Sequence, residues 1–132
     1  MMSLPPRALA LAGILGATGV AAGAFGAHGL NGFVAPAQLD VWKTAAHYQL
    51  VHALALMALG VSKMMSDALS ASIWLRRAFL CWAVGIVLFS GSLYLLVFIS
   101  IPALGFITPI GGVLLIAGWL SLLMAARNVA SS

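Results

Sequence analysis

The chain has 132 residues, of which 64% are hydrophobic and 6% are charged, and its formal net charge is +4. Soluble domains carry roughly a quarter of their residues as Asp, Glu, Lys and Arg, so this chain has too few charges to cover a water-soluble fold. The basic residues stand singly between apolar runs and not in a stripe, which argues against nucleic-acid binding. The composition predicts an integral membrane protein in a lipid bilayer.

A helix crosses the hydrocarbon layer of about 30 Å in about 20 residues. Four uncharged apolar runs have about that length, and they cover residues 8–27, 44–62, 78–99 and 108–126. Pro36, Pro102 and Pro109 mark the connections between them. We therefore predict an all-α fold, an integral membrane four-helix bundle that forms a single domain over residues 1–132.

The first run, 8–27, is striped with glycine at spacings of three and four residues. Small residues let membrane helices approach closely, and Gly19 and Gly23 form a GxxxG pair. Alanines give the opposite face a small surface too, so we expect this helix to lie at the centre of the bundle. The run lacks the Arg-rich amphipathic character of a mitochondrial leader, which favours the bacterial inner membrane.

The second run is the least apolar of the four. Its extension over 36–46 has the polar face of an interfacial helix, on which Asp40, Lys43 and His47 point to water. Helical geometry places Tyr48, Gln49 and His52 on another face, which should look into the bundle.

The third and fourth runs carry small-residue stripes of their own. The glycines predicted to make close helix contacts in the whole chain are Gly16, Gly19, Gly23, Gly26, Gly85, Gly111 and Gly118.

The basic residues predict the orientation of the bundle. With four crossings, one side collects Arg7, Lys63, Arg76, Arg77 and Arg127. The other side has only Lys43, so the positive-inside rule places both termini in the cytoplasm, an N-in/C-in arrangement. The alternative is three spans, with the second segment lying on the membrane surface, which would place the C-terminus opposite the N-terminus. Reporter fusions at Ser132 and in the 28–43 loop decide between the two, and an external C-terminus would contradict the four-span prediction.

Polar side chains inside a bilayer are the first candidates for function because they are costly there. This chain has a set of them near the predicted outer face, which we call the polar cluster: His28, Tyr48, Gln49, His52, Ser90, Ser92 and Tyr94. Gln49 and His52 can hydrogen-bond across helices to the serines, to Tyr94 or to backbone carbonyls. Alternatively, His28 with His52 or His47 can converge on a metal or haem.

The sequence offers little for catalysis or cofactor binding. It has no HExxH or GxSxG motif, and its two acids, Asp40 and Asp67, are predicted on opposite sides of the membrane. No carboxylate lies within a span, so a proton relay or cation site would lack its usual acid. We therefore predict no catalytic residues, no metal site, no cofactor and no enzyme activity.

Several segments resemble one known family in order along nearly the whole chain. They are Gly-Ala-Phe-Gly-Ala-His-Gly-Leu (23–30), His-Tyr-Gln (47–49) with His52, Phe-Ser-Gly-Ser-Leu-Tyr (89–94), Leu-Gly-Phe-Ile-Thr-Pro-Ile-Gly-Gly (104–112) and Gly-Trp (118–119). The pattern is that of the small bacterial inner-membrane proteins called domain of unknown function 423, related to eukaryotic transmembrane protein 256.

The resemblance implies a four-helix integral membrane protein and supplies no catalytic residues. It also implies that Thr108, Pro109 and all seven members of the polar cluster belong to the family pattern. Two functional hypotheses remain. The first is a non-enzymatic accessory subunit or self-associating interaction protein, found as a homo-oligomer or in a larger membrane complex. The alternative is small-molecule, ion or lipid handling through an outward-facing polar cavity.

Overall fold

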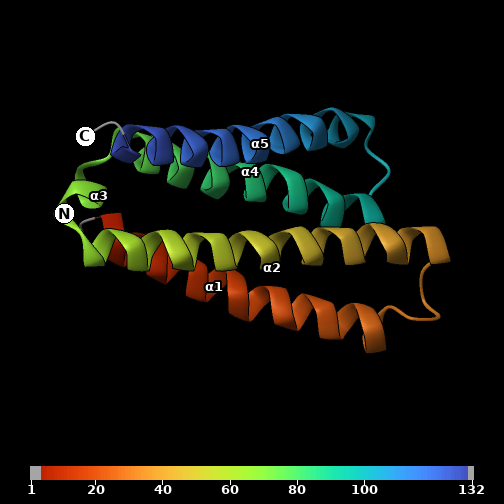
Figure 1. Cartoon of the computed structure of the whole chain (residues 1–132). Helices are drawn as coiled ribbons and strands as arrows, with labels where there is room; N and C mark the ends of the chain where they lie inside the picture. Colours follow the sequence, from red (N-terminus) through yellow and green to blue (C-terminus); the bar gives the residue numbers. More distant parts are fainter. Residues whose placement is uncertain (1–3, 131–132) are drawn as a thin grey trace.

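The computed structural model describes residues 4–130, and it is all-helical over that range (Figure 1). Its elements are α1 (Leu4–Ala24), the π-helical turn η1 (Phe25–Gly29), α2 (Pro36–Met65), α3 (Asp67–Ala71), α4 (Ile73–Phe98) and α5 (Pro102–Ala130). The spans that begin with α1, α2, α4 and α5 are long and apolar enough to cross a membrane. The predicted all-α, four-helix fold is confirmed.

The helices begin where local chemistry allows them to begin. α2 starts with Pro36 in its first turn, where a missing N–H costs nothing, and Gln38 Oε1 accepts the Ala35 N–H at 3.0 Å. The hydroxyl of Ser72 caps α4 by accepting the Leu75 N–H at 3.4 Å. Gly32, in the turn before α2, has φ of 89°, a left-handed conformation that glycine adopts without strain.

The helices are longer than the apolar runs that predicted them. α2 runs without a break from Pro36, so residues 36–46 are its first turns and not a separate interfacial helix. α5 begins at Pro102 and contains Pro109 in its second turn. Counting uncharged residues finds the hydrocarbon-spanning part of a helix, whereas helical hydrogen bonding continues beyond it.

The four long helices pack side by side in the order α1, α2, α4, α5 (Figure 1), and the α1–α2 and α4–α5 pairs make the most extensive contacts. α1 contacts mostly α2, and 17% of the residues in its most apolar stretch are buried, against 44% in α2. The prediction that the first helix is central is therefore wrong. Its glycines and alanines make two faces small, but the helix has a neighbour mainly on one side.

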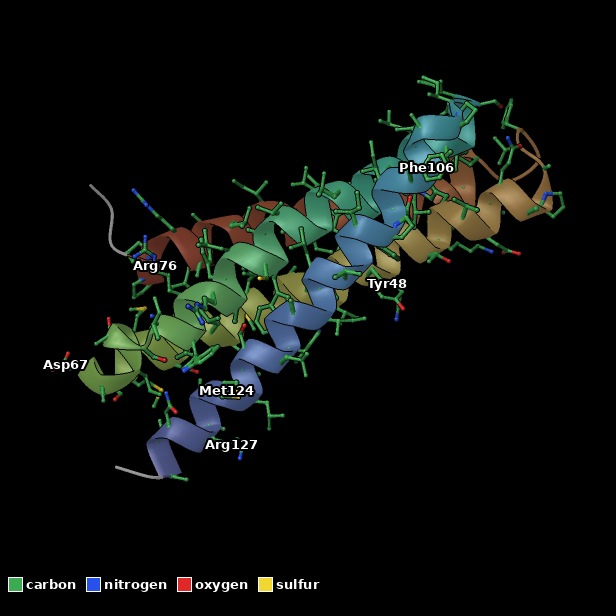
Figure 2. All side chains as sticks on the ribbon, turned by 90° about the horizontal axis from the view of Figure 1, so that it is seen from above. Tyr48, Asp67, Arg76, Phe106, Met124 and Arg127 are labelled. Carbon is green, nitrogen blue, oxygen red and sulfur yellow. The ribbon has the colours of Figure 1, made fainter. Side chains whose placement is uncertain are left out.

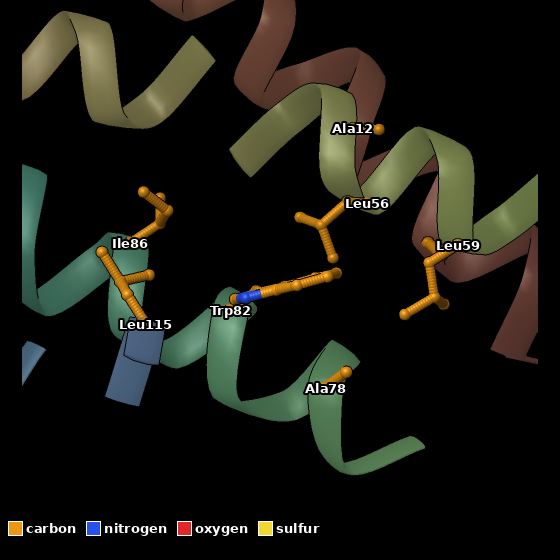
Figure 3. Packing of buried hydrophobic residues seen from close by; sticks show 8 residues of the cluster. Ala12, Leu56, Leu59, Ala78, Trp82, Ile86 and Leu115 are labelled. Atoms are coloured by element: carbon orange, nitrogen blue, oxygen red, sulfur yellow. The ribbon is translucent and has the colours of Figure 1, made fainter. Parts of the chain in front are cut away.

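The apolar core lies where α2 and α4 meet, with contributions from α1 and α5. Figure 3 shows Trp82 of α4 reaching toward Leu56 of α2. Trp82 is 1% exposed and its indole nitrogen has no hydrogen-bond partner in the described part of the chain. Burial of this large ring is the main apolar contribution at the centre of the bundle.

Five of the seven predicted packing glycines make close contacts within the chain. A methyl group on Gly19 would lie 2.8 Å from Leu50 Cδ2, and one on Gly26 would lie 2.6 Å from Trp42 Cδ1. Gly85 faces Leu115, while Gly111 and Gly118 would overlap Phe89 and Trp82. Leaving out the Cβ atom allows these approaches.

Gly16 and Gly23 differ from the other five, because a methyl group on either would have nothing within 4 Å. Their predicted role in helix packing is not fulfilled within one chain and remains a prediction for contacts with another molecule.

The first and last described residues lie at the same end of the bundle as α3 (Figure 1). Arg76, Asp67 and Arg127 lie at that end, and Phe106 lies at the other (Figure 2). The two described ends of the chain lie at the same end of the bundle because the chain runs along it an even number of times.

Candidate functional site

Gln49 of α2 connects three helices through its side-chain amide. Its nitrogen donates to the Leu15 carbonyl at 3.0 Å and to the Thr18 hydroxyl at 2.8 Å, both on α1. Its oxygen accepts from the Tyr94 hydroxyl of α4 at 2.7 Å. Gln49 is 6% exposed, and these three hydrogen bonds satisfy its amide nitrogen and oxygen inside the protein. The predicted cross-helix bonding of Gln49 to Tyr94 is confirmed.

His52 lies one turn further along α2 and is 3% exposed. The Trp119 indole N–H of α5 donates to its Nε2 at 3.1 Å. Nε2 must then be unprotonated, so Nδ1 carries the hydrogen and donates to the Tyr48 carbonyl at 2.8 Å. Both ring nitrogens are occupied, and the imidazole is fixed as one neutral tautomer between α2 and α5.

The two serines of the cluster join α4 to different neighbours. The Ser90 hydroxyl donates to the Ala45 carbonyl of α2 at 2.8 Å. Ser92 shares a 2.6 Å hydrogen bond with Thr108 of α5 and also bonds to the Phe89 carbonyl. One interpretation of the sequence had the serines bonding to Gln49 or His52. In the structure they do not, and each serine supports a separate helix contact instead.

The predictions for His47, Tyr48 and His28 have different outcomes. His47 is exposed, as its position on the wet face predicted. Tyr48 was expected to look into the bundle, but it is 41% exposed and only its ring packs, 4.7 Å from that of Phe89. His28 is exposed in η1, and no hydrogen bond or ring contact joins it to the cluster within residues 4–130.

Sequence reasoning missed three partners of the polar cluster. Thr18 is the single polar side chain between residues 8 and 27, and a lone polar residue in an apolar run could have indicated a buried hydrogen-bond partner. Trp119 occurs in the family pattern but was not paired with His52. Trp42 donates to the Ala22 carbonyl at 2.7 Å and packs 4.5 Å from the Tyr94 ring, so it belongs to the packing of the helices.

The arrangement holds helices together and presents few reactive groups. Within the part of the chain that the structure describes, no three His, Cys, Asp or Glu side chains lie close enough to hold a metal ion. The two acids lie at opposite ends: Asp40 near Lys43 at 4.0 Å, and Asp67 in the first turn of α3. Both ring nitrogens of His52 are hydrogen-bonded to protein groups and His28 is exposed in η1, so the pair gives the metal or haem alternative no support.

A second surface is left uncovered by residues 4–130. On the outer side of α1, Gly13, Gly16 and Gly23 have open space where a Cβ atom would stand, and we call this surface the open face of α1. Beside it runs an apolar groove of about 570 Å³, whose walls include Gly13, Gly16 and Val20 of α1 and Leu54 and Met57 of α2. Val20 and Leu54 are more than half exposed. The groove has the shape and polarity to receive another apolar helix.

Four long apolar helices, joined through buried polar contacts and glycine surfaces, define a small multi-pass membrane protein. The family described as "Protein of unknown function (DUF423)" matches residues 22–112, and the chain belongs to this family. The resemblance seen in the sequence is therefore confirmed.

Relatives of similar size support the assignment. A UPF0382 membrane protein of Staphylococcus aureus (strain bovine RF122 / ET3-1) is 49% identical over 112 residues, which are 84% of this chain and 87% of the relative. One from Bacillus subtilis (strain 168) is 45% identical over 81% of this chain and 85% of its own length. One from Haemophilus influenzae is 40% identical, with 86% and 88% covered. No solved structure matches the chain.

Proposed function

We propose that this protein is a non-enzymatic, self-associating interaction protein of the bacterial inner membrane, in which the open face of α1 packs against the same face of a second copy. The observation that carries this proposal is the unequal use of glycine. Neighbouring side chains or backbone occupy the space where a Cβ atom would stand at Gly19, Gly26, Gly85, Gly111 and Gly118. That space is open at Gly13, Gly16 and Gly23.

A second copy is the occupant that the surface itself favours. Small-residue stripes in membranes pack best against other small-residue stripes, because both backbones then approach closely. A two-fold contact uses the same patch on both partners, and each chain supplies one such patch. The open face and its groove carry no charged side chain, so two copies meet without repulsion.

The alternative of ligand handling gains no support from the geometry of the polar cluster. The amide of Gln49 and both ring nitrogens of His52 are engaged by protein groups, which leaves neither with a free atom for a ligand. The groove beside the open face of α1 is lined by apolar residues of α1 and α2 instead. These contacts support a packing role for the cluster and a binding role for α1.

The test measures molecular mass by light scattering after purification from native membranes in mild detergent. The wild-type protein should be a dimer, and Gly16→Leu should raise the dimer dissociation constant at least about fivefold, because overpacking a close contact costs roughly 1–3 kcal/mol. Gly91→Leu is the matched control, since Gly91 of α4 also faces open space.

A monomeric wild-type protein would overturn the proposal, and so would equal effects of the two substitutions. A stoichiometric complex with a different protein and no second copy would replace self-association by the accessory role.

A further inference from the structure

We propose that the bundle holds a binding site for a phosphate group at the end where the termini and α3 lie. A cavity of about 380 Å³ opens there between α1, α2 and the start of α4. Three basic residues from three helices line it: Arg7, Lys63 and Arg76. Residues 70–73, which connect α3 to α4, form the rest of its wall. We call this the cationic cavity.

Within residues 4–130, no carboxylate balances the positive charge of the cationic cavity. Lys63 is 3% exposed, and its ammonium group donates to the Ser70 carbonyl at 2.8 Å. An ammonium group has three donors, and burying a charge without a counter-charge is costly. Within residues 4–130 the ion pair present is Lys43 with Asp40, at the other end of the bundle. The structure therefore gathers three cations that lack a carboxylate partner.

Asp67 is the acid nearest in sequence to the cationic cavity, and it does not line it. It occupies the first turn of α3, a favourable position for a carboxylate beside a helix N-terminus. The wall of the cavity includes Ser72 and Ile73, at the N-terminus of the 26-residue helix α4. The positive end of that helix dipole adds to the field of the three side chains.

This combination of groups fits a phosphate. Arginine guanidinium groups bind phosphate oxygens through paired, charge-assisted hydrogen bonds, and lysine contributes a point charge. The cavity lies where the long helices end, which is the depth of lipid headgroups for a bundle that spans the bilayer. An anionic lipid headgroup and a free phosphate ion share this chemistry.

The experiment measures the thermal unfolding midpoint of the full chain in a neutral maltoside detergent. Phosphatidylglycerol, phosphatidylcholine, inorganic phosphate and chloride at matched ionic strength are added separately. Phosphatidylglycerol should raise the midpoint more than phosphatidylcholine, because a ligand that binds only the folded state stabilises it. Arg7→Gln and Arg76→Gln should each weaken the apparent affinity about fivefold, the effect expected for one basic side chain near an anionic surface.

Both substituted arginines are exposed, so the variants should fold. Arg127→Gln is the matched control: it removes one positive charge from the same end, away from the cavity, and should keep the full response. A response to phosphatidylglycerol alone identifies a lipid headgroup as the source, whereas a response to inorganic phosphate identifies a soluble anion. The proposal is overturned if neither changes the midpoint, or if Arg127→Gln weakens binding as much as Arg76→Gln.

Discussion

At the scale of single residues, the buried side chains of Gln49 and His52 are matched to hydrogen-bond partners on neighbouring helices. The sequence predicted that Gln49 and His52 face inward, because helical geometry alone decides which residues share a face. It could not predict their partners Thr18 and Trp119, because these depend on how far one helix is shifted along its neighbour. That shift is set by contacts such as Gly19 against Leu50, which sequence spacing does not reveal.

Tyr94→Phe tests the contribution of one of these bonds. The substitution removes the hydroxyl that donates to Gln49 at 2.7 Å and leaves the ring contacts in place. We expect the free energy of unfolding to fall by about 0.6 kcal/mol and by no more than roughly 1.7, the range of such bonds in membrane bundles. Reversible unfolding in mixed micelles measures it.

Tyr48→Phe is the control for Tyr94→Phe, because the Tyr48 hydroxyl has no hydrogen bond in the described part of the chain. Equal losses for both variants would show that the Tyr94 bond contributes nothing specific.

At the scale of helices, glycine decides which surfaces meet. The stripes seen in the sequence predicted close contacts correctly for Gly85, Gly111 and Gly118, and the α4–α5 pair depends on them. For the first helix the same stripes suggested a central position, and α1 instead lies at one edge. A small-residue stripe indicates that something packs closely there, but it does not distinguish a neighbour in the same chain from another molecule.

Two adjacent glycines of α5 allow a sharp test of the α4–α5 contact. A methyl group on Gly111 would overlap the backbone of Phe89, whereas one on Gly112 would lie 3.7 Å from the Phe89 ring, an ordinary contact. Gly111→Ala should destabilise the fold by roughly 1–3 kcal/mol. Gly112→Ala should be neutral or stabilising by up to about 1 kcal/mol, because alanine favours the helix. Unfolding titrations of both variants compare them, and a loss at Gly112 equal to that at Gly111 would contradict the assigned contact.

At the scale of the whole molecule, the packing order leaves α1 exposed on one side and collects the basic residues at one end. The number and type of helices follow from apolar run length, so the fold could be predicted from sequence. The open face of α1 and the cationic cavity could not, because both depend on which surfaces the chain leaves uncovered after folding. They also suggest different roles: one apolar surface for another helix, and one charged site at the depth of headgroups.

Disulfide trapping in native membranes tests the self-association of α1 most directly. Cys81 is the single cysteine, so a Cys81→Ala background accepts Gly16→Cys or Gly23→Cys on the open face and Gly91→Cys on α4 as the control. A disulfide needs Cα atoms within about 7 Å. We expect mild oxidation to convert the α1 variants to covalent dimers and to leave the Gly91 variant monomeric. Monomers throughout, or equal trapping at all three positions, would contradict it.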